Sequence, residues 1–143
     1  MRHWCWLLIW LPLFSYAEVE IRDAWARATA PGMPMGAVYG EIANEGSADV
    51  TLTAISTRSA RMAEIHESVE IDGMMRMREI TPFVIPAGKS VFLRPAGKHI
   101  MLMGLGEALV EGETLTINAT FSDGSEISVD AVVGGFGQMS KPE

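Results

Sequence analysis

Two histidines and two methionines, His66, Met77, His99 and Met101, have the residue types and the spacing to bind a metal ion. Ten residues lie between His66 and Met77, twenty-one between Met77 and His99, and one between His99 and Met101. Imidazole nitrogen and thioether sulfur are neutral ligands that suit monovalent copper, whereas magnesium, calcium and manganese prefer oxygen ligands. The four side chains therefore favour Cu(I), provided that the fold brings them together.

Four segments accompany this spacing and extend over most of the chain after residue 17. They are Asp23–Ala28, Glu64–His66, Met75–Arg78 and Gly97–Gly104. Together with the spacing they resemble the periplasmic copper chaperones of the PCuAC type, also described as the DUF461 family. The resemblance implies that His66, Met77, His99 and Met101 bind Cu(I). It also implies a cupredoxin-like Greek-key β-sandwich, and copper delivery toward the CuA centre of cytochrome c oxidase alongside Sco-type assembly proteins.

Each of the four residues has an ordinary alternative role when it is considered alone. A single histidine is usually a surface or hydrogen-bonded core residue, and a methionine on a strand usually packs against its neighbours. Both histidines that follow residue 17 fall inside the pattern, which leaves none for a rival metal site. The combination therefore favours one metal site over four independent structural roles.

Other methionines lie close to the pattern. Met75 and Met103 are each two residues from a predicted ligand and share its strand face. We expect them to pack around the site, with secondary contact to the metal as the alternative. Met33 and Met35 lie in a segment rich in proline and glycine, where they could shield copper or receive it.

The first 17 residues have the organisation of an export signal. A short charged start precedes an apolar run over residues 5–14, and Ser15-Tyr-Ala17 offers small residues for signal peptidase. We predict cleavage after Ala17, which removes the only cysteine, Cys5, and leaves 126 of the 143 residues. The apolar run is shorter than the ~20 residues that a bilayer-spanning helix needs. We therefore expect a periplasmic protein with no membrane insertion after cleavage, and Cys5 lies too early to serve as a lipid anchor.

The chain divides into three parts on composition. We expect a signal peptide at residues 1–17, one copper-binding β-sandwich domain at residues 18–134, and a flexible tail at residues 135–143. The tail has one methionine and no histidine, so the sequence predicts no strong second copper site there.

Charge and motifs exclude several function classes. The net charge of −7 disfavours nucleic acid and anionic membrane surfaces as partners. The sequence has no Gly-x-Ser-x-Gly elbow and no glycine-rich phosphate loop, so we expect no enzyme activity. A blue-copper electron-transfer centre is also disfavoured, because such centres need a cysteine thiolate beside two histidines.

Short apolar runs separated by turn residues predict an all-β domain with no helix. The predicted strands are Val19–Trp25, Ala37–Asn44, Val50–Ser56, Ala63–Ile71, Met74–Ile80, Ser90–Leu93, His99–Met103, Thr114–Phe121 and Ile127–Val133.

Asp72-Gly73 predicts a tight hairpin, because a type I′ turn needs positive φ at both central residues. With these two residues as the loop, Ser68 faces Met77, and His66 and Met77 become diagonal neighbours on one face. Glu67 then faces Arg78 as a charge pair on the other face. That other face also carries a predicted core stripe, which consists of Ile65, Val69, Ile71, Met74 and Ile80.

The same alternation applies to the strand that begins at His99. Ile100 and Leu102 point to one face and are the better core candidates, which leaves His99 and Met101 on the outer face or rim.

The leading hypothesis from the sequence is a periplasmic Cu(I) chaperone. A second hypothesis is copper sequestration or resistance without a dedicated acceptor. A third is a metal-free Ig-like interaction module in which the methionines form a hydrophobic patch.

Overall fold

The computed structural model describes residues 18–143, so the predicted signal peptide, Cys5 and the cleavage after Ala17 lie outside the described residues. Within this range the chain forms ten strands and no helix. The strands are β1 (Val19–Arg27), β2 (Met35–Asn44), β3 (Val50–Ser56), β4 (Ala60–Ile71), β5 (Met74–Glu79), β6 (Phe83–Ile85), β7 (Ser90–Leu93), β8 (His99–Leu105), β9 (Thr114–Phe121) and β10 (Glu126–Gly134). Accordingly, residues 18–143 contain no apolar helix of the length that a membrane crossing requires.

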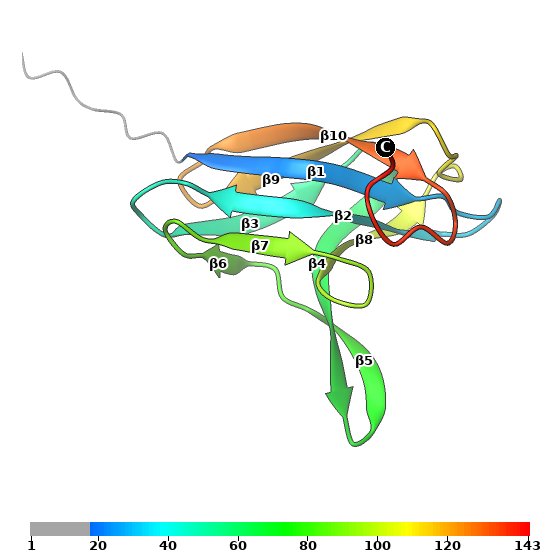
Figure 1. Ribbon diagram of the computed structural model, residues 1–143, viewed down its shortest axis with the longest axis horizontal. Helices are drawn as coiled ribbons and strands as arrows, with labels where there is room; N and C mark the ends of the chain where they lie inside the picture. The colour runs from blue at the N-terminus through cyan, green and yellow to red at the C-terminus, as the bar shows by residue number, and fades with distance from the viewer. Residues whose placement is uncertain (1–17) are drawn as a thin grey trace, which may run out of the picture.

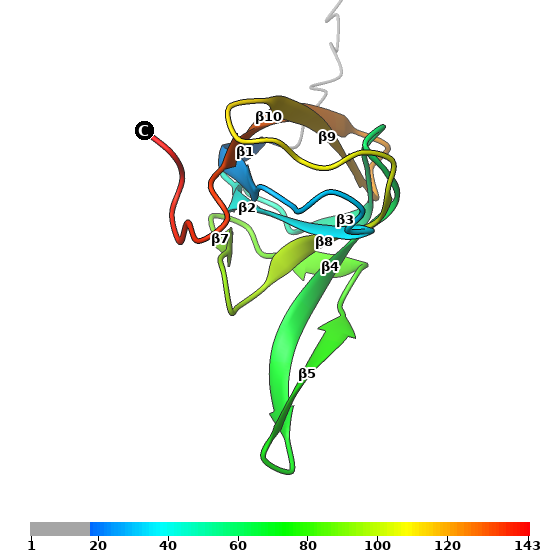
Figure 2. The same cartoon turned by 90° about the vertical axis from the view of Figure 1, so that its right-hand side faces the viewer.

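The strands form one continuous sheet in the order β5-β4-β8-β2-β1-β10-β9-β3-β6. An additional pairing between β3 and β4 closes seven of these strands into a barrel-like ring, while β7 pairs with β2 at the side. Figures 1 and 2 show this ring from two directions, with β1 and β10 adjacent and parallel. The predicted all-β single domain is confirmed.

Alternation of side chains along the strands produces the core. In β9 every second residue, namely Leu115, Ile117, Ala119 and Phe121, is buried, whereas the residues between them are more exposed. Ile65 in β4 and Ile100 and Leu102 in β8 belong to the same core cluster. The predicted core role of Ile100 and Leu102 is therefore confirmed.

A bulge in β1 sets the position of the aromatic residues on the outer face. The pairing of β1 with β2 shifts between Arg22 and Trp25, and Asp23 has a φ of 53°. A side chain at Gly40 opposite would lie 2.9 Å from the carbonyl oxygen of Arg22, so the two backbones approach closely only because this residue is glycine. Beyond the bulge Trp25 pairs with Tyr39.

The ends of β4 and β5 form an arm that projects from the barrel (Figures 1 and 2). Asp72 and Gly73 have φ values of 52° and 78°, and Ser68 pairs with Met77 as the turn predicts. The predicted core stripe is correct only near the barrel, where Ile65 is buried. Ile71 and Met74 are 49% and 60% exposed, because the arm extends beyond the elements that could cover them.

All nine predicted strands agree with the structure to within three residues at either end, and three of them, Val50–Ser56, Ser90–Leu93 and Thr114–Phe121, agree at both ends. The sequence prediction missed β6, which has three residues and lies between Pro82 and Pro86. It forms because Val84 and Ile85 pair with β3.

The C-terminal tail returns toward β1. Arg27 Nε donates to the Gln138 carbonyl oxygen at 2.8 Å, and Lys141 pairs with Asp23 at 3.0 Å. The flexibility of this segment stays a prediction.

Candidate metal centre

The two candidate histidines lie directly opposite each other on neighbouring strands. His66 of β4 pairs with His99 of β8, so both side chains project from the same outer face of the sheet. Their ring centroids are 6.4 Å apart. One metal ion that binds a nitrogen of each ring at about 2 Å fits this separation.

Hydrogen bonds assign one nitrogen of each ring as a donor. His99 Nδ1 donates to the Gly97 carbonyl oxygen at 2.9 Å, and this leaves the lone pair on Nε2. His66 Nε2 donates to Glu64 Oε2 at 2.9 Å, and this leaves the lone pair on Nδ1. Each ring therefore keeps one nitrogen that can bind a metal.

The Nδ1 atom of His66 is buried and has no hydrogen-bond partner among residues 18–143. An unsatisfied buried polar atom costs free energy, and functional sites are where such costs are tolerated. A soft cation at this position would satisfy the lone pair.

Met101 lies on the same outer face as His99 and pairs with Glu64. His99 and Met101 are only 5% and 8% exposed, although they point away from the main core. The two side chains lie on the predicted face of β8, but they are buried in the barrel and not on an exposed rim.

Met77 lies on β5, two residues from His66 in the pairing register toward the tip of the arm, and its side chain is 58% exposed. The pairing of Ser68 with Met77 confirms that Met77 and His66 share a face. Met77 and Met101 are thus both diagonal neighbours of His66, on opposite sides of it. The structure brings His66, His99 and Met101 together directly and carries Met77 on the projecting arm. Met75 is further out on the arm and 66% exposed.

An aromatic row continues from the histidines across the barrel. The Tyr39 ring lies 6.5 Å from His99 and 4.7 Å from Trp25, and the guanidinium of Arg27 lies 5.6 Å above the Tyr39 ring. Burial raises the pKa of the Tyr39 phenol, and the Arg27 charge opposes this change. Tyr39 is therefore an uncharged aromatic side chain that lies on one side of His99.

On the opposite face of the arm, Glu67 pairs with Arg78 as predicted. The hydrogen bond from Arg78 holds the pKa of the Glu67 carboxyl below its ordinary value, while partial burial acts in the other direction.

The sequence analysis assigned no role in the site to the side chains of Glu64 and Tyr39. The signal for Glu64 was present, because a residue two positions before His66 on a strand shares its face. Tyr39 could not be found in this way, since its contact with His99 depends on the long-range pairing of β2 with β8.

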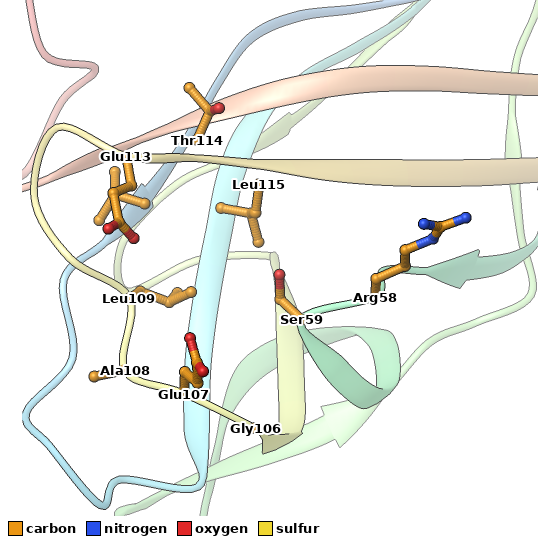
Figure 3. Close-up of a pocket in the computed structure, with 10 residues that line it drawn as sticks. Arg58, Ser59, Gly106, Glu107, Ala108, Leu109, Glu113, Thr114 and Leu115 are labelled. Carbon is orange, nitrogen blue, oxygen red and sulfur yellow. The ribbon is translucent and has the colours of Figure 1, made fainter.

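The candidate donors are imidazole nitrogen and thioether sulfur atoms, which hard metal ions do not prefer. Within the described part of the chain, no three histidine, cysteine, aspartate or glutamate side chains gather as a possible metal site. A hollow between the β3–β4 turn, the loop after β8 and the start of β9 carries Arg58, Glu107 and Glu113 but none of the candidate ligands (Figure 3). Any metal ion at the histidine pair would therefore depend on soft donors.

Comparison with known families matches the model described as "Putative lipoprotein LpqE-like" to residues 19–133. This chain belongs to the LpqE-like family. A curated relative, "Putative lipoprotein Lxx21020" of Leifsonia xyli subsp. xyli (strain CTCB07), is 36% identical over 119 residues, which cover 82% of this chain and 70% of the relative.

Solved structures similar to this LpqE-like chain include copper-binding domains. The solution structure of Cu(I)-DR1885 from Deinococcus radiodurans is 28% identical with a TM-score of 0.62, and the match covers 80% of this chain and 78% of that one. The copper-bound PCuAC domain of PmoF2 is 18% identical with a TM-score of 0.69, over 85% and 97% of the two chains. The apo form of that domain is 19% identical with a TM-score of 0.73, over 85% and 94%. The LpqE-like chain therefore has the fold of PCuAC domains.

Proposed function

We propose that this protein is an exported Cu(I) carrier that holds copper between His66, His99 and Met101, with Met77 as a fourth ligand from the arm. The observation that carries the proposal is the opposed histidine pair, in which each ring keeps a free lone pair and that of His66 is buried without a partner. The Cu(I)-bound structure of DR1885, at 28% identity, supports the choice of metal. Met75 and Met103 are secondary contacts in this proposal.

The division between barrel and arm suggests how copper is released. His99 and Met101 are buried in the barrel, whereas Met77 is exposed on an arm that few elements support. An acceptor that offers thiolates would displace the Met77 thioether first and the barrel ligands afterwards. Copper stays monovalent throughout, so the transfer is ligand exchange and needs no oxidant and no catalytic residue.

We further propose a periplasmic location, with delivery toward the CuA site of cytochrome c oxidase alongside Sco-type proteins, as the PCuAC resemblance implies. The description of the family as lipoproteins supports export. On the same basis, the closed sheet corresponds to a cupredoxin-like Greek-key sandwich.

Sequestration without an acceptor is the alternative function. Transfer to an apo oxidase copper subunit, followed by the visible absorption of that subunit, separates delivery from sequestration.

The direct test is a Cu(I) titration under reducing conditions against a chromophoric chelator. We expect the tightest Cu(I) site of the wild type to be lost in His66→Gln/His99→Gln and to be weaker in Met101→Leu and Met77→Leu. Leucine keeps the volume of methionine and removes the sulfur, so the fold should be retained. Met74→Leu is the matched control, because Met74 is on the arm but on its other face. Unchanged affinity in the double histidine variant would overturn the proposal.

A further inference from the structure

Three methionines, of which only Met103 has a secondary place in the site described above, lie in one row across three neighbouring strands. Met103 of β8 pairs directly with Met35 of β2 on one side and with Met62 of β4 on the other. Directly opposite residues in antiparallel strands project from the same face, with Cβ atoms about 4.5–5.5 Å apart. The three thioethers therefore rise side by side from the outer face of the sheet.

Their exposure does not fit a packing role. Met35 and Met62 are 45% and 53% exposed, and none of the three belongs to the main core cluster. Leaving long apolar side chains next to one another in solvent forgoes the free energy that their burial would provide. Methionine is also flexible enough for the outer two sulfur atoms to turn toward the one above the middle strand.

The chemistry of the row selects a soft monovalent cation. Three thioethers are neutral and need not lose a proton before they bind a metal, and soft sulfur ligands favour Cu(I) over hard cations. The basic residue next to Met62 in the sequence is Arg61, and the stem of its side chain packs against Gly104. The acidic neighbour on the same face is Glu64, two residues from Met62.

We propose that Met35, Met62 and Met103 form a second, thioether-only site for Cu(I) or Ag(I). The row lies two residues along β8 from Met101, which is about 7 Å. A metal held there would be adjacent to the histidine site but would need none of its imidazoles. The proposal therefore goes beyond the function proposed above, and the two sites can be tested independently.

The test uses Ag(I), a soft monovalent ion that needs no reductant, with the stoichiometry read by native mass spectrometry. Three variants are compared with the wild type: Met35→Leu/Met62→Leu/Met103→Leu, His66→Gln/His99→Gln, and the control Met33→Leu/Met74→Leu/Met139→Leu. The control removes three other exposed methionines. Circular dichroism and thermal melting establish that each variant is folded.

We expect two Ag(I) ions on the wild type and the control, and one on each of the other two variants. In the histidine variant, the methyl NMR signals of Met35, Met62 and Met103 should shift together as Ag(I) is added. If the histidine variant binds no silver, or if these three signals stay unmoved, the second site is overturned while the histidine site stands. If the triple methionine variant binds none and the histidine variant keeps one ion, the second site stands and the histidine site is overturned.

Discussion

At the scale of single residues, the histidine pair depends on the groups that hold each ring. The Gly97 carbonyl oxygen and the Glu64 carboxylate each accept one ring N–H. Such partners fix the tautomer and the orientation of a ligand before the metal arrives. Glu64 is therefore a positioning residue for His66 and need not touch copper itself.

Replacement of Glu64 tests this role. We expect Glu64→Ala to weaken Cu(I) affinity by about tenfold or more, as removal of outer-shell partners does at other metal sites. Glu64→Gln should restore most of the affinity, because an amide oxygen still accepts the Nε2–H of His66. Competition against a chelator measures both variants, with Glu67→Ala as the control on the opposite face. Equal affinity of Glu64→Ala and the wild type would refute the positioning role.

Protons should compete with copper at the imidazoles. Histidine is the side chain that gains a proton in mildly acidic solution, and a protonated ring cannot bind a metal. We expect Cu(I) affinity to fall as the pH is lowered from about 7.5 to about 5. The same titration of His66→Gln/His99→Gln should show no such fall in any residual binding. A flat profile for the wild type would contradict histidine ligation.

At the scale of elements, the arm could be predicted from the sequence and its surroundings could not. Asp72-Gly73 specifies the turn, and the turn specifies which residues of β4 and β5 face each other. Alternation also predicts which face His99 and Met101 occupy. It does not predict what covers that face, because the contact of Tyr39 with His99 comes from a strand some sixty residues earlier. For the same reason, the sequence could not predict that the pairing of Ile55 with Ala63 closes the ring.

The turn itself provides a test of the arm. Gly73 has a φ of 78° with open space around it, so Gly73→Ala adds only backbone strain, about 1–2 kcal/mol. We expect faster hydrogen exchange in the arm and weaker Cu(I) affinity, because Met77 is held less firmly. Gly88→Ala is the matched control, since Gly88 has a φ of 69° and open space in a different loop. Equal effects of the two variants on copper affinity would count against a role for the arm.

The Glu67–Arg78 pair makes the arm sensitive to acid. Because Arg78 lowers the pKa of Glu67 in the folded arm, the pair stabilises the arm above the ordinary glutamate pKa. That stabilisation is lost as the pH falls through the lowered folded-state value. We expect the amide NMR signals of residues 66–80 to show loosening of the arm in this acidic range. Arg78→Gln should reduce the dependence, which Lys98 also supports, and an unchanged profile in that variant would refute the role of Arg78.

At the scale of the whole molecule, stability resides in the barrel and not in the arm. Asn44 is one of the two buried polar residues of the described chain, at 1% exposure. Its Nδ2 donates to the carbonyl oxygens of Ala48 and Ile85 at 2.8 and 3.0 Å, and its Oδ1 accepts from the Gly46 amide at 3.0 Å. This side chain therefore joins the loop after β2 to the end of β6.

We expect Asn44→Ala to destabilise the protein by about 2–3 kcal/mol, because it leaves buried backbone groups without partners. The melting temperature should fall by roughly 10 °C, as followed by circular dichroism. Asn118→Ala is the control, since Asn118 bonds only to the exposed Ser128 hydroxyl. Similar melting temperatures for Asn44→Ala and Asn118→Ala would show that the buried amide is dispensable.

The position of β5 at one end of the strand order has a consequence for how copies of the protein meet. Its outward backbone groups have no strand partner within residues 18–143, and such an edge is a template for pairing with a second molecule. If two arms were to pair antiparallel about Met77, Arg76 of one copy would face Arg78 of the other. Repulsion between these guanidinium groups would disfavour this pairing and leave the arm accessible to a different partner.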